Sequence, residues 1–211
     1  MTKRITLLSL LFFFITASFA QGYKITIKIR GIKPNEVYLL ASYYADKNQK
    51  VDSAISDKNN QVIFKGKNKL PNGIYLVVTP DRNYFEMVIS EQEQEFTIET
   101  DTLFESEKMV VKNSKENNSF FEFNNFASIK SLEYEAMKAS LVIAKTKSDT
   151  LAAQKQFHAL DSQIQGKRQE IANRNPSLFI SKVFRCFREL DEPIPLRNPD
   201  GSLQDSNYRY T

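Results

Sequence analysis

The sequence predicts an α+β protein, with an N-terminal antiparallel β-sandwich of about eight short strands followed by a helical segment of about three helices. Two patterns support this fold class. Between residues 22 and 112, short apolar runs alternate with turn signals roughly every ten residues. Beyond residue 119, apolar residues recur at the spacing of amphipathic helices. Segments that could form helical crossovers between the strands are missing, which disfavours a parallel βαβ architecture.

The clearest strand is expected at Tyr23–Ile29, where apolar residues alternate with lysine and threonine as in a half-buried strand. The nearly continuous apolar segment Ile74–Pro80 is expected to be a central strand, and Asp46–Lys50 a loop. The other strands are expected at Val37–Ala45, Val51–Ser56, Gln61–Gly66, Tyr84–Ser90, Glu95–Thr100 and Lys108–Lys112.

A polar segment then breaks the strand pattern, and residues 113–118 are expected to link the β domain at 21–112 to a helical domain at 119–190. The first helix is expected over Ser119–Ala144, with an apolar stripe at Phe123, Phe126, Ile129, Leu132, Ala136, Ala139 and Ile143. The second helix, capped by Ser148 or Asp149, is expected to bury Ala153, Phe157, Leu160, Ile164 and Ile171.

The third helix is expected over Pro176–Leu190, because Asn175 and Pro176 resemble an N-cap followed by proline at the first helical position. Its stripe would contain Phe179, Val183, Cys186, Phe187 and Leu190. Residues 191–211 are proline-rich at first and are expected to form an extended tail.

Residues 1–20 are typical of a secretory signal peptide. Lys3 and Arg4 precede an apolar run, and the small residues Ser18 and Ala20 end it before Gln21. The run is shorter than the ~20 apolar residues that span a bilayer, and no cysteine follows the cleavage site to carry a lipid anchor. The chain is therefore expected to be exported to the periplasm or cell envelope, without a membrane span after cleavage.

Export changes the charge balance. Lys3 and Arg4 leave with the signal peptide, so 27 basic residues face 25 acidic ones and the net charge falls from +4 to +2. A chain with this charge and no basic stripe is not expected to bind nucleic acid.

The sequence predicts no catalytic, cofactor-binding or metal-binding residue. Cys186 is the only cysteine and His158 the only histidine, so a dithiol motif cannot form and a zinc site lacks ligands. Cys186 is expected to be a small buried residue on the third helix. His158 is expected at the surface or at the edge of the second helix.

Two further features have a structural and a functional interpretation. The acidic segments Glu91–Glu95 and Phe104–Glu107 lack the spacing of a calcium loop and are expected to be solvated turns. The segment Ser119–Phe126 holds Phe120, Phe121, Phe123 and Phe126, which is more aromatic surface than one helix face needs. We expect these rings to pack on the β domain, and otherwise to contact a partner.

The order of motifs resembles exported thioredoxin-like thiol–disulfide proteins of the TlpA/ResA kind from Bacteroidetes. The β segment is similar to their N-terminal domain of unknown function at Val37–Leu39, Asp52–Ala54, Val62–Gly66 and Gly73–Tyr75. The helical part, with its "RNPDGSLQDSNYRY" tail, is similar to the domain of unknown function that precedes their thioredoxin domain. The resemblance covers most of residues 22–211.

The thioredoxin domain itself, with its W-C-x-x-C-type site, has no counterpart here, because the chain contains no tryptophan and one cysteine. The resemblance therefore implies a non-catalytic accessory or binding module, whose partner is a thioredoxin-like domain or the substrate proteins of that domain. Sheet edges and the cluster Phe120–Phe126 are the expected contact surfaces.

Two alternatives remain open at this point. The chain could be a catalytically incomplete fragment of a thiol–disulfide oxidoreductase, or a stand-alone envelope protein that binds a glycan or another small ligand. Tyr208 and Tyr210 alternate around Arg209 like strand residues with nothing after them, so Ser202–Thr211 is expected to be poorly packed and the tail truncated.

Overall fold

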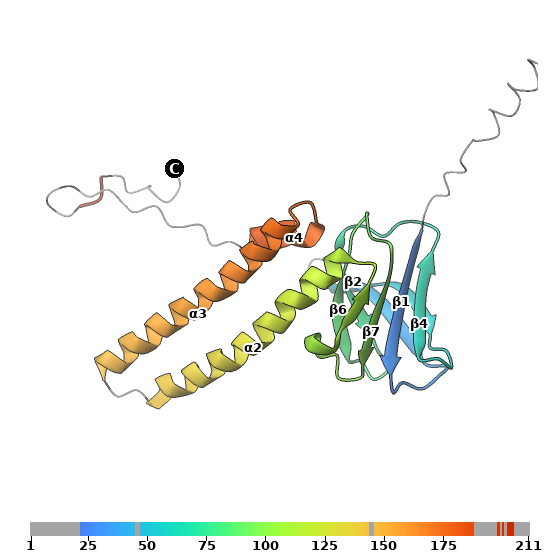
Figure 1. The fold of residues 1–211 in the computed structure, drawn as a ribbon, viewed down its shortest axis with the longest axis horizontal. Helices are drawn as coiled ribbons and strands as arrows, with labels where there is room; N and C mark the ends of the chain where they lie inside the picture. Colours follow the sequence, from blue (N-terminus) through green and yellow to red (C-terminus); the bar gives the residue numbers. More distant parts are fainter. Residues whose placement is uncertain are drawn as a thin grey trace, which may run out of the picture.

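A computed structural model describes residues 22–44, 47–143 and 146–187, with residues 198, 200 and 202–204. Two four-stranded sheets pack face to face, and a hairpin of two long helices leaves the sandwich from one side (Figure 1). The α+β class with a sandwich before the helices is confirmed. The predicted signal peptide lies outside the described residues.

The first sheet has the strand order β4-β1-β7-β8. Its register places Ile25 beside Phe96 and Ile27 beside Ile98 in a parallel pair, so the expectation of purely antiparallel pairing is wrong between β1 and β7. The chain travels from β1 to β7 through the second sheet, so this pair needs no crossover helix. The strands are β1 (Tyr23–Arg30), β4 (Gln61–Gly66), β7 (Glu95–Asp101) and β8 (Val110–Lys112).

The second sheet has the order β3-β2-β5-β6, and β5 is interior, as its apolar sequence predicted. Strand β3 begins at Lys47, so the predicted loop Asp46–Lys50 is wrong from that residue onward. These residues are polar because both of their faces are exposed, and period-two reasoning cannot detect such a strand. The strands are β2 (Val37–Tyr44), β3 (Lys47–Ile55), β5 (Gly73–Val78) and β6 (Tyr84–Ile89).

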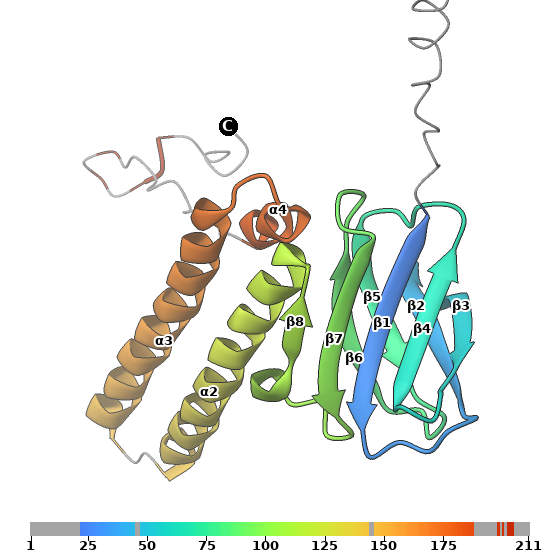
Figure 2. The same cartoon turned by 45° about the vertical axis from the view of Figure 1, so that its right-hand side comes forward.

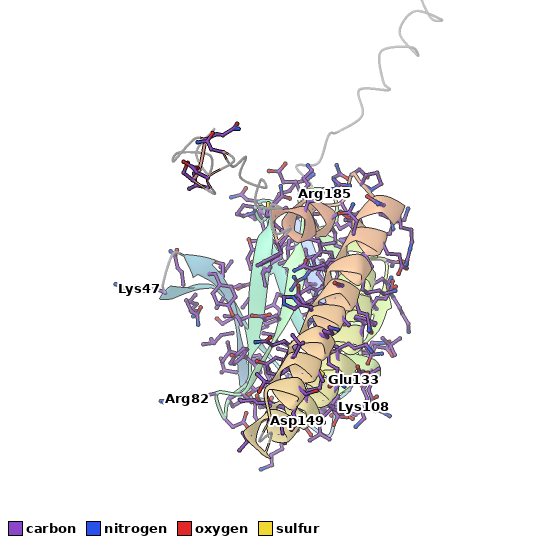
Figure 3. The ribbon with its side chains drawn as sticks, turned by 90° about the vertical axis from the view of Figure 1, so that its left-hand side faces the viewer. Lys47, Arg82, Lys108, Glu133, Asp149 and Arg185 are labelled. Atoms are coloured by element: carbon purple, nitrogen blue, oxygen red, sulfur yellow. The ribbon has the colours of Figure 1, made fainter. Side chains whose placement is uncertain are left out.

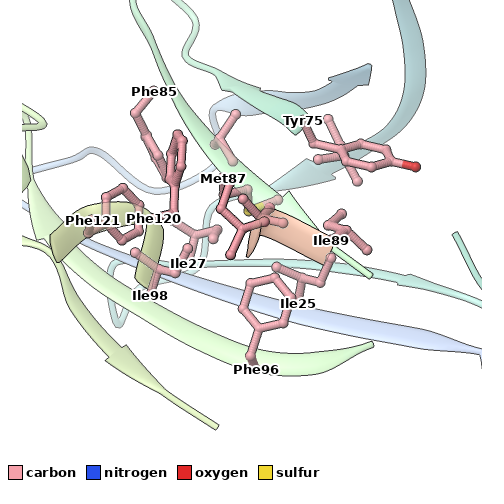
Figure 4. Close-up of a cluster of buried hydrophobic side chains, with 14 of the residues drawn as sticks. Ile25, Ile27, Tyr75, Phe85, Met87, Ile89, Phe96, Ile98, Phe120 and Phe121 are labelled. Carbon is pink, nitrogen blue, oxygen red and sulfur yellow. The ribbon is translucent and has the colours of Figure 1, made fainter. Parts of the chain in front are cut away.

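The core lies between the two sheets and continues under the first turns of the helical hairpin. Ile25, Ile27 and Ile29 of β1 are fully buried, as the alternation predicted. Figure 4 shows Ile25 and Ile27 among residues from β6 and β7, with Phe120 and Phe121 at one side. Each buried isoleucine contributes about 1.5–3 kcal/mol relative to exposure, which makes this layer the main source of stability in a chain with one cysteine.

A 3-10 turn, η1 (Ser106–Lys108), lies between β7 and β8. The described residues after the strands form the α-helices α2 (Lys115–Ile143), α3 (Lys147–Arg174) and α4 (Phe179–Cys186). Helix α2 begins at Lys115, so most of the predicted linker 113–118 is helical. Its polar residues do not mark a gap between domains, because they bind the sandwich through hydrogen bonds that a hydrophobic pattern cannot reveal.

The helix ends also differ from the predictions. Thr146 caps α3 and forms a capping box with Asp149, so Asp149 is the third helical residue rather than the cap. Asn175 is the C-cap of α3, and α4 starts three residues beyond Pro176. The N-cap position of α4 is Leu178, whose side chain cannot accept a hydrogen bond.

The predicted apolar stripes are correct for α3, where Ala153, Leu160 and Ile171 are buried. The stripe of α2 is buried at Phe123, but Ile129 and Leu132 farther along it are exposed. The stripe of α4 is correct in part, because Phe179 and Val183 are partly buried against the core. Cys186 and Phe187 are exposed, and the fully buried positions are Ile180, Ser181 and Phe184.

The described part of the tail forms a turn. The amide of Asn198 donates to the carbonyl of Ser202 over 2.8 Å, and Asp200 accepts from the amide of Ser202 over 2.9 Å. Ser202, Leu203 and Gln204 are exposed. Tyr208 and Tyr210 lie outside the described residues.

Candidate binding surface

The N-terminus of α2 is anchored to the sandwich by one acidic turn. The carboxylate of Glu93 accepts hydrogen bonds from the hydroxyl of Ser114 (2.6 Å) and from the amides of Lys115 (2.9 Å) and Glu116 (3.1 Å). A carboxylate is favourable here because the first amides of a helix lack partners and carry partial positive charge. The segment Glu91–Glu95 is therefore a helix-capping turn, not only a solvated one.

Asn117 ties the same helix to the edge of the second sheet. Its side-chain amide donates to the carbonyl of Val88 over 2.7 Å and accepts from the amide of Val88 over 2.8 Å. Asn117 is fully buried, and it supplies the two hydrogen bonds that a neighbouring strand would have supplied. The edge of β6 is thus covered at this point, which removes one of the sheet edges that had been expected as contact surfaces.

Glu116 connects α2 to α4. Its carboxylate accepts hydrogen bonds from the amides of Phe179 and Ile180, both over 2.8 Å, and its side chain is 2% exposed. These amides open the first turn of α4, where Leu178 offers no side-chain cap. The sandwich, α2 and α4 are therefore held in one arrangement by Glu93, Glu116 and Asn117.

The aromatic cluster is part of this junction. Phe120, Phe121 and Phe123 are buried, and Phe123 packs against Phe184 of α4 with ring centroids 4.9 Å apart. Packing on the β domain, the structural interpretation of these rings, is confirmed. The expectation that Phe120–Phe126 also offers a contact surface is wrong, because three of its four rings are already covered and Phe126 is half-buried.

Arg168 interrupts the apolar face of α3 and is stabilised there by aromatic rings. Its guanidinium lies 5.0 Å from the ring centroid of Phe123 and 5.1 Å from that of Phe187. Cation–π contacts of this kind allow an arginine to occupy a core-facing position. They also fix the angle between α3 and α4.

A second contact between the long helices is ionic. Glu122 of α2 accepts two hydrogen bonds from the guanidinium of Arg174 (2.8 and 3.0 Å). It also forms an ion pair with Lys167 over 2.9 Å. The hydrogen bonds from Arg174, followed by those from Lys167, hold the pKa of the Glu122 carboxyl below its usual value. This network lies at the junction end of the hairpin.

The distal half of α2 presents an unpartnered apolar surface, which we call the α2 row: Ile129, Leu132, Ala136 and Ala139. Ile129 is 56% exposed and Leu132 is 72% exposed. Tyr134, which contacts Phe157 edge-on at 5.3 Å, belongs to the face that meets α3. The α2 row thus follows the stripe that the sequence predicted, and no described residue covers it.

Figure 3 shows the course of the helical hairpin. The hairpin runs from the junction, marked by Arg185, to a distal end marked by Glu133 and Asp149. Figure 1 shows that this distal end diverges from the sheets. The row therefore lies on a rigidly attached arm at a distance from the sandwich.

The two candidate reactive residues lie apart from each other. Cys186 is exposed at the end of α4, so the prediction that it is buried is wrong. The face of α4 that packs on its neighbours passes through Ile180 and Phe184 instead. His158 is exposed on α3, as predicted, and about 24 Å of helix separates it from Arg174 at the end of α3.

No cluster of three or more histidine, cysteine or acidic side chains suited to a metal ion occurs among the described residues. In the second acidic segment, Glu105 forms an ion pair with Lys108 over 2.6 Å. Within the described ranges, neither long helix has a stretch apolar enough to cross a bilayer. The absence of catalytic and cofactor-binding residues remains a prediction.

Residues 23–120 match the model of a family described as a domain of unknown function, DUF4369. This match supports the resemblance of the β segment to such a domain, and it extends past the sandwich into the first turns of α2. The structure gives a physical reason for that extent, because Glu116, Asn117 and Phe120 are bonded to or buried against the sandwich. No curated protein matches the chain.

Proposed function

We propose that this chain is a non-catalytic accessory module of an exported thioredoxin-like thiol–disulfide protein, and that it acts in the periplasm or cell envelope. Its docking surface is the α2 row, and the occupant is a thioredoxin-like domain. The observation that carries the proposal is the exposure of Ile129 and Leu132 on a helix whose other end is rigidly bonded to the sandwich.

The composition of the row supports a protein as the occupant. Ala136 and Ala139 are small and allow a second apolar element to approach the helix closely, while Ile129 and Leu132 supply area to bury. The exposed residues beside the row include Ser128, Ser131 and Glu135, so the basic border typical of a membrane-binding helix is missing there. A module with one cysteine can position a dithiol enzyme without performing the dithiol cycle.

The test is a titration of the chain with a separately expressed thioredoxin-like domain, in its oxidised and reduced forms, followed by calorimetry. Leu132→Asp should weaken binding at least tenfold, because the loss of a buried leucine contact and the burial of a charge each cost more than about 1.4 kcal/mol. Ile55→Asp is the matched control, since Ile55 is 62% exposed on β3 and lies outside the row.

Equal binding by the Leu132→Asp and Ile55→Asp variants would refute the row as the docking surface. A thiol-reduction assay on the isolated chain tests the other half of the proposal. Measurable turnover would show that the chain is an enzyme in its own right.

A further inference from the structure

Three loops meet at the end of the sandwich opposite α4. Strands β1 and β7 are parallel and both end there, and the turn between β5 and β6 lies at the same end (Figure 2). Figure 3 places Arg82, in the β5–β6 turn, far from Arg185 of α4. The loops are residues 31–36, 79–83 and 102–105.

These loops surround a cavity of about 240 Å³. At ~30 Å³ per water molecule, this volume corresponds to about eight waters, the size of a small polar ligand. The side chains that argue for a ligand are Lys33, Glu36, Tyr38, Asp81, Asn83 and Phe104.

Tyr38 lies at the floor of the cavity and is the first sign of a binding site. Its side chain is 1% exposed, and no described residue forms a hydrogen bond with its hydroxyl. Burial, followed by the charges of Glu36 and Asp81, raises the pKa of this phenol to about 12. The hydroxyl is therefore protonated at neutral pH and can donate a hydrogen bond. The hydroxyl oxygen is not among the fully buried polar atoms that lack a partner, so it is open to water or to a ligand in the cavity.

The rim is built to hold its polar groups in place. The hydroxyl of Thr79 donates to the carboxylate of Asp81, which keeps the pKa of Asp81 below its usual value. The β5–β6 turn is closed by the backbone, where the amide of Thr79 donates to the carbonyl of Asn83 over 2.9 Å. Glu36, in contrast, forms no side-chain hydrogen bond with a described residue, so its carboxylate is free to accept one from a ligand.

Backbone geometry supports a preformed site. Asn35, Arg82 and Phe104 have φ values of 64°, 66° and 55°, in the left-handed region that non-glycine residues rarely adopt. One of these residues lies in each of the three loops. Such conformations cost on the order of 1–3 kcal/mol each and are concentrated at functional sites.

The mixture of groups identifies the ligand class. An anion would meet the carboxylates of Glu36 and Asp81, and a simple cation would meet the ammonium of Lys33. A neutral molecule with adjacent hydroxyls suits the acceptors and the donors of the cavity. Each hydroxyl can donate a hydrogen bond to a carboxylate and accept one from the phenol or the ammonium. The ring of Phe104, half-buried at the wall, offers an apolar face for the carbon skeleton.

We propose that the cavity bounded by Glu36, Tyr38, Asp81 and Phe104 is a binding site for a small neutral polyhydroxylated ligand of the monosaccharide class. This site is on the sandwich, whereas the α2 row is on the helical hairpin. The sugar-binding proposal therefore goes beyond the accessory function proposed above, and the two proposals can be tested separately.

The experiment is saturation-transfer NMR on the whole chain with free glucose, galactose, mannose and N-acetylglucosamine, and with ethylamine and acetate as charged probes. A sugar should bind with a dissociation constant on the order of millimolar, as expected for a small open site. Tyr38→Phe and Glu36→Gln should each weaken it about tenfold, the effect of one lost hydrogen bond. Tyr43→Phe, which removes a hydroxyl outside the cavity, should bind as tightly as the wild type.

Three outcomes would overturn the proposal. The first is that none of the four sugars binds. The second is that ethylamine or acetate binds and the sugars do not. The third is that a sugar binds but Tyr38→Phe and Glu36→Gln leave its affinity unchanged while circular dichroism shows both variants folded, which would locate the binding elsewhere.

Discussion

The capping of α4 by Glu116 leads to the most specific stability prediction. Glu116→Ala removes the acceptor of two amides, Phe179 and Ile180, whose hydrogen bonds are both 2.8 Å long. The site is 2% exposed, so water cannot replace the carboxylate without opening the junction. Each buried amide without a partner costs about 1–3 kcal/mol, and removal of the buried charge offsets part of the sum. The expected net loss is about 3 kcal/mol.

Thermal denaturation followed by circular dichroism measures this loss, and it should appear as a Tm lower by roughly 6–12 °C for a chain of this size. Glu116→Gln keeps one acceptor oxygen, so it should lose about half as much. Hydrogen exchange should accelerate at the amides of Phe179 and Ile180 in both variants. Glu135→Ala, at an exposed position of the same helix, is the control. A Glu116→Ala variant as stable as Glu135→Ala, with both amides still protected, would refute the reasoning.

Three further predictions concern the junction and Cys186. Asn117→Leu should destabilise the fold by about 2–4 kcal/mol, because the backbone groups of Val88 lose both partners; a denaturation midpoint equal to the wild type would contradict this. In the folded protein the pKa of the Glu122 carboxyl is below its ordinary value of 4.5. The ionised carboxylate therefore stabilises the fold fully at pH values above the unfolded-state pKa, and this stabilisation is lost as the pH falls through the folded-state pKa. The stability difference between wild type and Glu122→Gln should therefore shrink from about pH 6 to about pH 3, and a constant difference would argue against the ion pair with Arg174. Cys186 should react with a thiol reagent in the native protein about as fast as in urea, since it is exposed; strong protection in the native state would contradict this.

The strand pattern was predictable because burial on one face leaves a period of two in the sequence. Ile25, Ile27 and Ile29 illustrate this, since all three are fully buried and the residues between them are polar. The parallel pairing of β1 with β7 was not predictable, because alternation is the same for both directions of pairing. The start of α2 was missed because Glu116 and Asn117 are polar residues buried through hydrogen bonds, which a hydrophobic pattern does not register.

The candidate sites were less predictable than the fold. The apolar residues of the α2 row could be predicted as a stripe from their helical spacing. Their exposure could not be predicted, because helical spacing shows that residues share one face and does not show whether another element packs against that face. The cavity was invisible, since Glu36, Tyr38 and Asp81 come from segments about forty residues apart.

The amino-acid pattern alone was sufficient for the order of strands and helices, the buried face of β1 and of α3, and the impossibility of a dithiol within the chain. These properties depend on local spacing and on residue counts. The side on which α4 packs, the exposure of Cys186, the capping by Glu93 and Glu116, and the polar cavity beside Tyr38 were decided by tertiary contacts. They depend on hydrogen bonds and packing between distant segments, whose free energy is determined by which groups meet and not by the order in which they occur in the chain.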